Sequence, residues 1–366
     1  MAPQDLLSTD TSVPARFEVR RRAYLAPDGT IMAPLPGFAE DKAVLTPLYR
    51  GMVLLRAFDV KAVSLQRTGR LGTYATSLGQ EAVGVGVASA MRHEDVLVPS
   101  YRETGALLWR GVKMEEHLLY WGGDERGSNN SGPHHDFPMC VPVGSQAPHA
   151  AGIAYAIKLR RQDRVAVCIF GDGATSKGDV WEAMNFAGLH KLPVIFVIAN
   201  NQWAISVPLK LQTAAETLAQ RAIGAGIPGE QVDGNDVIAV RAATMDAMRA
   251  ARAGRGPTLI ECVTYRLGDH TTADDASRYR SDQEVRERWK AEPISRLRRY
   301  LTNRGLWSKA EEEQLVAACQ AEIEAAVERY LAVTPRRPAT MFDHLYDRLP
   351  RAYRAQQDTL REAGDA

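Results

Sequence analysis

Two apolar runs, each followed by small or polar residues, constrain the fold of this chain more than any other feature. The first run is Val165–Phe170, and the motif Gly-Asp-Gly follows it at 171–173. The second run is Val194–Ala199, and two asparagines follow it at 200–201. Residues Asp179–His190, between the runs, have the pattern of a helix. A strand, a helix and a second strand form a βαβ unit, in which a right-handed crossover joins parallel strands.

The same alternation of short apolar strands and helices extends along much of the chain. Further strands are expected at Asp95–Pro99 and Thr258–Tyr265. Further helices are expected at Thr46–Gly69, Gly79–Met91, Glu103–Arg110, Ala147–Leu159 and Val237–Ala253. Continuous apolar strands that alternate with helices are typical of a parallel sheet with helices on both faces. The sequence therefore predicts an α/β fold.

Composition along the chain divides it into three segments. Residues 1–45 are rich in Pro, Gly, Asp and Arg, which indicates an extended N-terminal arm that wraps a partner or is partly disordered. Residues 46–281 form the expected α/β domain. Residues 282–366 are expected to form a C-terminal surface helical segment and tail, because they are charged and carry an apolar stripe at helical spacing. That stripe consists of Trp289, Ile294, Leu297 and Leu301.

The charge and cysteine content exclude several classes of protein. Lys and Arg number 45 against 44 Asp and Glu, so no excess of basic residues indicates nucleic-acid binding. The four cysteines show no C-x-x-C spacing, which favours buried, reduced thiols. The first residues lack the apolar centre of a signal peptide, and the longest apolar run, 192–199, is too short to span a membrane. We therefore expect a soluble, cytoplasmic protein.

The two polar motifs predict a metal and diphosphate site. Asp172 lies just beyond the first strand and Asn201 just beyond the second. If the two strands are neighbours they lie about 4.8 Å apart, and the two side chains would meet at the carboxyl edge of the sheet, where open α/β sheets bind ligands. Mg²⁺ prefers oxygen ligands and commonly takes several from phosphates and water. Either motif alone is also typical of an ordinary turn, whereas the pair with this spacing is more specific.

Small residues after the first strand would let the backbone approach a phosphate closely. Gly171 and Gly173 carry no side chain, and Ala174 and Thr175 are small. The helix that follows is expected to point its amino end, which attracts anions, at the same place.

At these residues the chain resembles a known family. The tract 171–208, GDGATSKGDVWEAMNFAGLHKLPVIFVIANNQWAISVP, is similar to the alpha subunits of pyruvate and branched-chain 2-oxo acid dehydrogenases, and the resemblance extends from about Tyr49 to Leu306. It implies the thiamine-diphosphate-binding fold and the cofactors thiamine diphosphate and Mg²⁺. By this likeness Asp172, Asn201 and the backbone carbonyl of Trp203 would hold the metal. Many relatives have Tyr at the last position, but a carbonyl ligand should tolerate the change.

A Tyr-Arg pair follows the expected strand at Asp95–Pro99. Arg102 has the planar fork that binds a diphosphate through two hydrogen bonds, and the hydroxyl of Tyr101 would add a donor. From the residues alone, an ordinary surface arginine is a competing interpretation. The resemblance implies that both side chains contact the diphosphate.

The loop at 140–148 is the next segment that the resemblance interprets. It implies that Val141 and Val143 support the bent cofactor, with Val143 under its two rings. The residues alone also fit a proline-rich turn with one buried valine. Some relatives hold a structural K⁺ in this loop; Cys140 occupies one such position here, so we do not expect this ion.

A polar loop after the expected strand at Thr258–Tyr265 contains His270. Histidine suits proton transfer near neutral pH, although a lone loop histidine usually has no special role. The resemblance implies that His270 is catalytic and contacts the cofactor, and that Arg266 lies beside the phosphates. His134 and His135 lack a third convincing ligand, so we interpret them as a solvated loop.

The resemblance also implies a reaction. It predicts oxidative decarboxylation of a 2-oxo acid and transfer of the acyl group to a lipoyl group. Tracts 71–86 and 265–280 are most similar to bacterial pyruvate dehydrogenase alpha subunits, which favours pyruvate as substrate. A branched-chain 2-oxo acid such as 3-methyl-2-oxobutanoate is the alternative, and acetoin dehydrogenase is a more distant one.

The family places the carboxylate that activates the cofactor on a separate beta subunit. Glu81 and Glu103 invite a single-chain interpretation, but neither is assigned that role here. The expected partners are a beta subunit, in an α2β2 heterotetramer, and the lipoyl domain of a dihydrolipoyl acyltransferase core. A non-catalytic assembly subunit is a competing hypothesis, which the intact motif residues disfavour. A single-chain enzyme of the transketolase type is another, but the chain is too short to hold both cofactor-binding domains.

Overall fold

A six-stranded parallel sheet forms the centre of the protein. A computed structural model describes residues 12–364. The strand order is β1-β7-β8-β4-β3-β2, and every neighbouring pair in this sheet is parallel. The bounds of these strands, in that order, are Arg20–Arg22, Gly229–Asp233, Thr258–Val263, Val194–Asn200, Ala166–Gly171 and Val96–Val98. The α/β fold class expected from the sequence is confirmed.

The predicted βαβ unit is present. Strands β3 and β4 are neighbours, and helix α6 (Gly178–Leu189) connects them. Their register pairs Gly171 with Ala199, so both strands end at the same edge of the sheet. Asp172 and Asn201 each begin the loop that leaves this edge.

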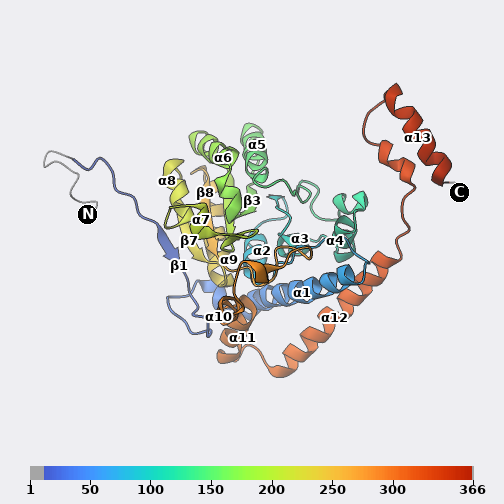
Figure 1. Cartoon of the computed structure of the whole chain (residues 1–366). Helices are drawn as coiled ribbons and strands as arrows, with labels where there is room; N and C mark the ends of the chain where they lie inside the picture. The colour runs from blue at the N-terminus through green and yellow to red at the C-terminus, as the bar shows by residue number, and fades with distance from the viewer. Residues whose placement is uncertain (1–11, 365–366) are drawn as a thin grey trace.

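Helices cover both faces of the sheet (Figure 1). Alternate residues of β3 and β4 point to opposite faces, and two separate hydrophobic clusters result. On one face the strands pack against α5 (Gln146–Leu159) and α6. On the other face they pack against α2 (Glu81–Ser89), α3 (Thr104–Trp109) and α9 (Val237–Arg252).

A third hydrophobic cluster lies outside this sandwich. The long helix α1 (Lys42–Arg67) packs against α12 (Lys309–Leu331), α11 (Pro293–Asn303) and α4 (Met114–Trp121). Ile294, Leu297 and Leu301 of the expected stripe are buried there, whereas Trp289, at the end of α10 (Asp282–Trp289), remains partly exposed. The C-terminal helices are therefore not only a surface layer, because α11 and α12 share a core with α1.

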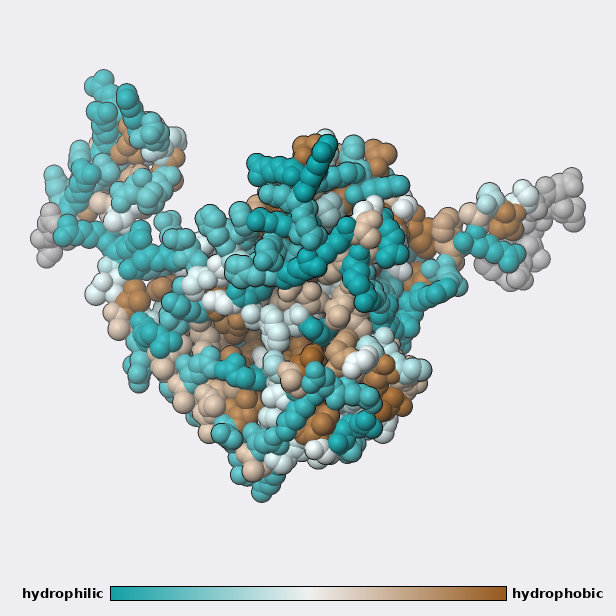
Figure 2. All heavy atoms as spheres, turned by 180° about the vertical axis from the view of Figure 1, so that it is seen from behind, coloured by the Kyte–Doolittle hydropathy of each residue, from teal (hydrophilic) through white to brown (hydrophobic). Residues whose placement is uncertain are grey.

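The two ends of the chain project from opposite sides of the body (Figure 1). Near the N-terminus, β1 joins the edge of the sheet beside β7, and Asp236 accepts hydrogen bonds from the backbone N–H groups of Tyr24 and Leu25. Part of the expected arm thus folds onto its own chain, while residues 1–11 lie outside the described residues. Near the C-terminus, α13 (Arg351–Gly364) contacts a preceding 3₁₀ turn, Pro338–Phe342. This projection carries both hydrophobic and hydrophilic residues at its surface (Figure 2).

Short elements complete the fold. They are β5 (Trp203–Ala204), β6 (Val207–Pro208), α7 (Leu209–Gln212) and α8 (Arg221–Gly224). Strands β5 and β6 form an antiparallel hairpin directly after Asn201. Among the described residues, no helix is both long and apolar enough to cross a membrane.

Candidate active site

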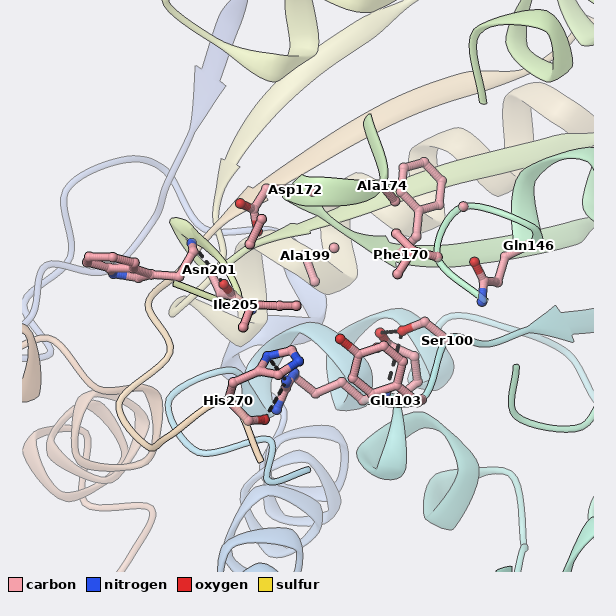
Figure 3. A pocket seen from close by; sticks show the side chains of 18 of the residues that line it. Ser100, Glu103, Gln146, Phe170, Asp172, Ala174, Ala199, Asn201, Ile205 and His270 are labelled. Carbon is pink, nitrogen blue, oxygen red and sulfur yellow. Dashed lines mark hydrogen bonds between the residues drawn. The ribbon is translucent and has the colours of Figure 1, made fainter. Parts of the chain in front are cut away.

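A pocket of about 200 Å³ lies at the carboxyl ends of β2, β3 and β4 (Figure 3). It brings together most of the residues that the sequence singled out. Those that line it are Tyr101, Arg102, Val141, Val143, Gly171, Asp172, Gly173, Ala174, Asn201, Trp203 and His270. Thr175 and Arg266 do not line it.

Asp172 is held at the pocket wall with its carboxylate almost fully desolvated. The residue is 1% exposed, and Gln212 Nε2 donates a hydrogen bond to its Oδ2 at 2.8 Å. Burial raises the pKa of Asp172 above its usual value, because a charged carboxylate loses solvation there, although the hydrogen bond from Gln212 opposes this. A cation at this place would compensate the buried charge.

The side chain of Asn201 lies beside Asp172, and both ends of its amide group make a hydrogen bond. Its Oδ1 accepts a hydrogen bond from the backbone N–H of Trp203 at 3.1 Å. Its Nδ2 donates to Gln80 Oε1 at 3.0 Å. The carbonyl of Trp203 faces Arg266, whose Nη1 lies 3.4 Å away.

These groups fit a magnesium diphosphate. The expected ligands are a carboxylate, a carboxamide and a carbonyl, and all three offer the oxygen atoms that Mg²⁺ prefers. Three buried amide atoms around the site have no hydrogen-bond partner among the described residues: Gln80 Nε2, Gln146 Oε1 and Gln212 Oε1. Buried polar atoms are rarely left unsatisfied, so their clustering here indicates a polar ligand.

The segment after β3 approaches the pocket closely. A Cβ atom built on Gly173 would lie 2.8 Å from Ala204 Cβ, so only glycine leaves room for the β5–β6 hairpin. A 3₁₀ turn, Asp172–Ser176, separates β3 from α6, so the pocket wall is formed by this turn and not by the amino end of α6. Thr175 lies behind the wall, where its hydroxyl donates to the carbonyl of Asp172 at 2.7 Å.

His270 lies across the pocket from Asp172 (Figure 3) and forms a second polar group with Arg102. Arg102 donates to the carbonyls of Thr76 and His270, at 2.6 and 2.9 Å, and its Nη2 lies 3.1 Å from His270 Nδ1. Because an arginine can only donate, Nδ1 must accept, and the neutral imidazole carries its proton on Nε2. Burial, together with Arg102 and Arg266, lowers the pKa of His270 to about 4. The ring of Tyr101 lies edge-on to His270, with 6.1 Å between ring centroids.

Arg266 lies fully buried behind the pocket. It donates to the carbonyl of Ile205 and to the hydroxyl of Tyr279, both at 2.8 Å. Burial lowers the pKa of Arg266 to about 10. Its contacts hold the β5–β6 hairpin and the His270 loop together.

Three apolar side chains flank the opening of the pocket. Val141 and Val143 are 50% and 51% exposed, although they line the pocket. Ile205, in the turn between β5 and β6, has φ 55°, a conformation that β-branched residues rarely adopt. Strain of this kind collects at functional sites. Sequence reasoning missed Ile205, because nothing in a single sequence indicates a positive φ at an isoleucine.

Sequence reasoning also missed polar residues on the inner wall. Gln80, Ser100 and Gln146 line the pocket. Glu103 lines it too, is 4% exposed, and accepts a hydrogen bond from the hydroxyl of Ser100 at 2.8 Å. Burial raises the pKa of Glu103 to about 7. Glu81 lies outside the pocket, where Arg56 donates to it at 2.8 Å.

The remaining candidates are outside the site. His134 and His135 are exposed, with ring centroids 5.6 Å apart. Within residues 12–364, no group of three or more His, Cys, Asp or Glu side chains is arranged to hold a metal. The four cysteines are free thiols, and only Cys140 is partly exposed.

Comparison with known proteins agrees with this geometry. Residues 49–335 match the family model described as "Dehydrogenase E1 component". The chain is 48% identical over 295 residues to the 3-methyl-2-oxobutanoate dehydrogenase subunit alpha of Mycobacterium tuberculosis, a match that covers 80% of each chain.

Two pyruvate dehydrogenase E1 component alpha subunits are similarly related. That of Acholeplasma laidlawii is 47% identical over 283 residues, which is 77% of this chain and 82% of the relative. That of Staphylococcus aureus is 41% identical over 319 residues, which is 87% of this chain and 86% of the relative.

Proposed function

The chain belongs to the dehydrogenase E1 component family, and from this membership and the pocket we propose that it is the alpha subunit of a pyruvate dehydrogenase that uses thiamine diphosphate and Mg²⁺. The observation that carries the proposal is that Asp172, Asn201 and Trp203 line one pocket at the carboxyl edge of the sheet. The reaction is the oxidative decarboxylation of pyruvate, with transfer of the acetyl group to a lipoyl group.

Asp172, Asn201 and the carbonyl of Trp203 would hold Mg²⁺. The diphosphate would lie against Gly171, Gly173 and Ala174, which line the pocket. When bound, thiamine diphosphate supplies an electron sink for the carbon–carbon bond cleavage. The task of this chain is to bind and orient the cofactor.

Arg102 and Tyr101 supply donors toward the diphosphate, and Val141 and Val143 support the rings from the open side. Thr175 and Arg266 act from behind the pocket wall, since Thr175 braces the backbone at Asp172 and Arg266 braces the hairpin at Ile205. Ile205 adds a third apolar contact at the opening.

His270 is the catalytic residue that we propose on this chain. Its Nδ1 is occupied by Arg102, so its Nε2–H is the end that is available to donate a hydrogen bond. A neutral imidazole donor can stabilise negative charge that develops on the bound intermediate during acyl transfer. The low pKa of about 4 keeps His270 in this neutral form at physiological pH.

A branched-chain substrate is the second candidate. The 48% identity to a 3-methyl-2-oxobutanoate dehydrogenase alpha subunit favours it, whereas the 47% and 41% identities to pyruvate dehydrogenase alpha subunits favour pyruvate. The pocket residues described here bind the cofactor that both reactions share, so they do not distinguish the substrates.

The expected partners are a beta subunit, in an α2β2 heterotetramer, and the lipoyl domain of a dihydrolipoyl acyltransferase core. Half-exposed valines at the opening of the pocket support a covering subunit, because apolar residues beside a cofactor are usually buried. The beta subunit would supply the activating carboxylate. The alpha chain would then need the beta subunit in order to catalyse the reaction.

Co-expression with the beta subunit, followed by an artificial-acceptor assay, tests the function. We expect little activity from the alpha chain alone, and faster decarboxylation of pyruvate than of 3-methyl-2-oxobutanoate by the complex. The reverse preference would assign the branched-chain function, and full activity of the alpha chain alone would exclude the subunit model.

The His270→Ala variant of the complex tests the catalytic assignment in the same assay. It should bind the cofactor as the native complex does, because His270 is not a metal ligand, and it should lose acyl transfer to the lipoyl domain. Native rates of acyl transfer in this variant would remove His270 from the mechanism.

A further inference from the structure

The side chain of Asn201 can hold a metal in only one of its two orientations. A carboxamide has an oxygen at one end and an NH₂ group of similar shape at the other, and only the oxygen binds a cation. Shape alone does not select between the two, so the surrounding hydrogen bonds must do so.

Two neighbours select the orientation of Asn201. The backbone N–H of Trp203 can only donate, so the end that faces it, at 3.1 Å, must be Oδ1. The opposite end, Nδ2, then requires an acceptor, and Gln80 Oε1 supplies it at 3.0 Å. Both contacts together fix the rotation of the amide about its Cβ–Cγ bond.

Gln80 reaches this place from a distant and rigid turn. Its backbone N–H donates to the carbonyl of Ser77 at 2.8 Å, and it precedes helix α2 directly. The preceding Gly79 has φ +89°, and a Cβ atom there would lie 2.3 Å from the carbonyl oxygen of Tyr265. The turn therefore packs against the start of the His270 loop and leaves the Gln80 side chain little freedom.

The other end of the Gln80 amide has no competing partner. Its Nε2 is buried and makes no hydrogen bond among the described residues. Gln80 also lines a cavity of about 10 Å³ together with Ser77, Arg102 and Glu103, which is close to the smallest volume that holds one water molecule. The hydrogen bond with Asn201 is thus the one side-chain hydrogen bond of Gln80 among the described residues, and it supplies the acceptor that Asn201 Nδ2 requires when Oδ1 faces the Trp203 N–H.

We propose that Gln80 is a positioning residue for the metal, because it holds the Asn201 oxygen toward the site. This inference rests on the proposed function, since it assumes that Asn201 binds Mg²⁺. Gln80 itself does not touch the metal. Residues that orient metal ligands typically contribute 10- to 100-fold to metal affinity.

The test compares Gln80→Met with Gln80→Glu in the assembled α/β complex. Methionine fills a similar volume but offers Asn201 Nδ2 no oxygen acceptor, whereas glutamate keeps an oxygen at the same reach. Thiamine diphosphate is titrated calorimetrically at a series of Mg²⁺ concentrations. For Gln80→Met we expect the Mg²⁺ concentration at half-maximal binding to rise by about 10- to 100-fold. For Gln80→Glu we expect a value close to the native one.

Gln231→Met is the matched control. Gln231 also makes one side-chain hydrogen bond, to Glu261 at 3.2 Å, but it lies on β7, away from the pocket. This variant should keep the native Mg²⁺ dependence. Thermal unfolding of all three variants identifies a loss that arises from misfolding.

The outcomes separate this inference from the proposed function. A folded Gln80→Met complex with native Mg²⁺ dependence would overturn the role of Gln80 and leave the function intact. Equal losses in Gln80→Met and Gln80→Glu would also overturn it, because the oxygen acceptor would then be irrelevant. A native complex that binds the cofactor equally well without a divalent metal would instead refute the metal site itself.

Discussion

Glu103 is a pocket residue whose ionisation lowers the stability of the folded chain. It is buried in the inner wall of the pocket, with the hydroxyl of Ser100 as its hydrogen-bond donor. Burial raises the pKa of Glu103 to about 7, because it outweighs the hydrogen bond from Ser100 and the charge of Arg102, which both lower the pKa. The carboxyl group therefore titrates near neutral pH. Its neutral form is favoured in the folded chain, because burial removes the solvation of the charged form.

This residue makes the stability of the chain depend on pH. Below pH 4.5 the carboxyl group of Glu103 is protonated in both the folded and the unfolded chain. Between about pH 4.5 and 7 it ionises only in the unfolded chain, so the free energy of unfolding falls as the pH rises. Above pH 7 it is ionised in both chains, and the free energy of unfolding falls no further. In the native chain this fall in the free energy of unfolding is at most about 3 kcal/mol, and the Glu103→Gln variant should not show it. Urea unfolding of both cofactor-free chains at pH 5 and pH 8 measures it, and a stability difference that is equal at both pH values would contradict it.

Pocket residues were predictable from the sequence where the side chain itself carries a group that binds a metal or a phosphate. Asp172, Asn201 and Arg102 carry groups that bind a metal or a phosphate, and their places after strands follow from the chain order. The roles of Gln80 and Glu103 were not predictable in this way, because that of Gln80 depends on a hydrogen bond with Asn201, 121 residues further along the chain, and that of Glu103 on its burial. Such contacts arise only when the fold brings remote segments together.

At the scale of elements, hydropathy predicted those strands that are buried on both faces. Strands β3 and β4 are almost wholly buried and read as continuous apolar runs. Strands β1 and β7 were missed, because β1 consists of three arginines and β7 buries only Val232. Their formation depends on the neighbouring strand and not on their own composition, since β7 pairs with β8 and β1 pairs with β7.

The contact between the turn after β3 and the β5–β6 hairpin can be tested with two glycines. Gly173→Ala would bring a Cβ atom to 2.8 Å from Ala204 Cβ, so the hairpin must shift, and we expect a loss of about 1–3 kcal/mol in unfolding free energy. Gly171→Ala is the control, because a Cβ atom there meets nothing within 4 Å. Chemical denaturation measures both, and equal stabilities of the two variants would show that the hairpin is not tightly packed.

At the scale of the whole molecule, the two projecting ends differ in how they are attached. The N-terminal end is tied to the body by Arg22, which pairs with Glu230 and Asp246 at 3.0 and 2.8 Å, and by Leu25, which is buried in the α1 cluster. The C-terminal end after Thr334 packs mainly on itself, through α13 and the preceding 3₁₀ turn.

Truncation should therefore have unequal effects at the two ends. A chain that ends at Thr334 should unfold at nearly the native temperature, because it loses few contacts with the core. A chain that begins at Ala26 should unfold at a lower temperature, by several degrees, since it loses β1 and buried Leu25. Differential scanning calorimetry compares them, and a larger loss from the C-terminal truncation would refute this account of the attachments.

The buried carboxylate of Asp172 links the stability of the folded chain in a cell to the supply of its ligand. Without a cation the carboxylate is a cost to folding, and the proposed cofactor with its metal would offset that cost by binding only the folded chain. At a ligand concentration 100 times the dissociation constant, such binding stabilises the fold by about 2.7 kcal/mol. A shortage of the cofactor would therefore leave more chains open to proteases, and the abundance of the subunit in the cell would fall.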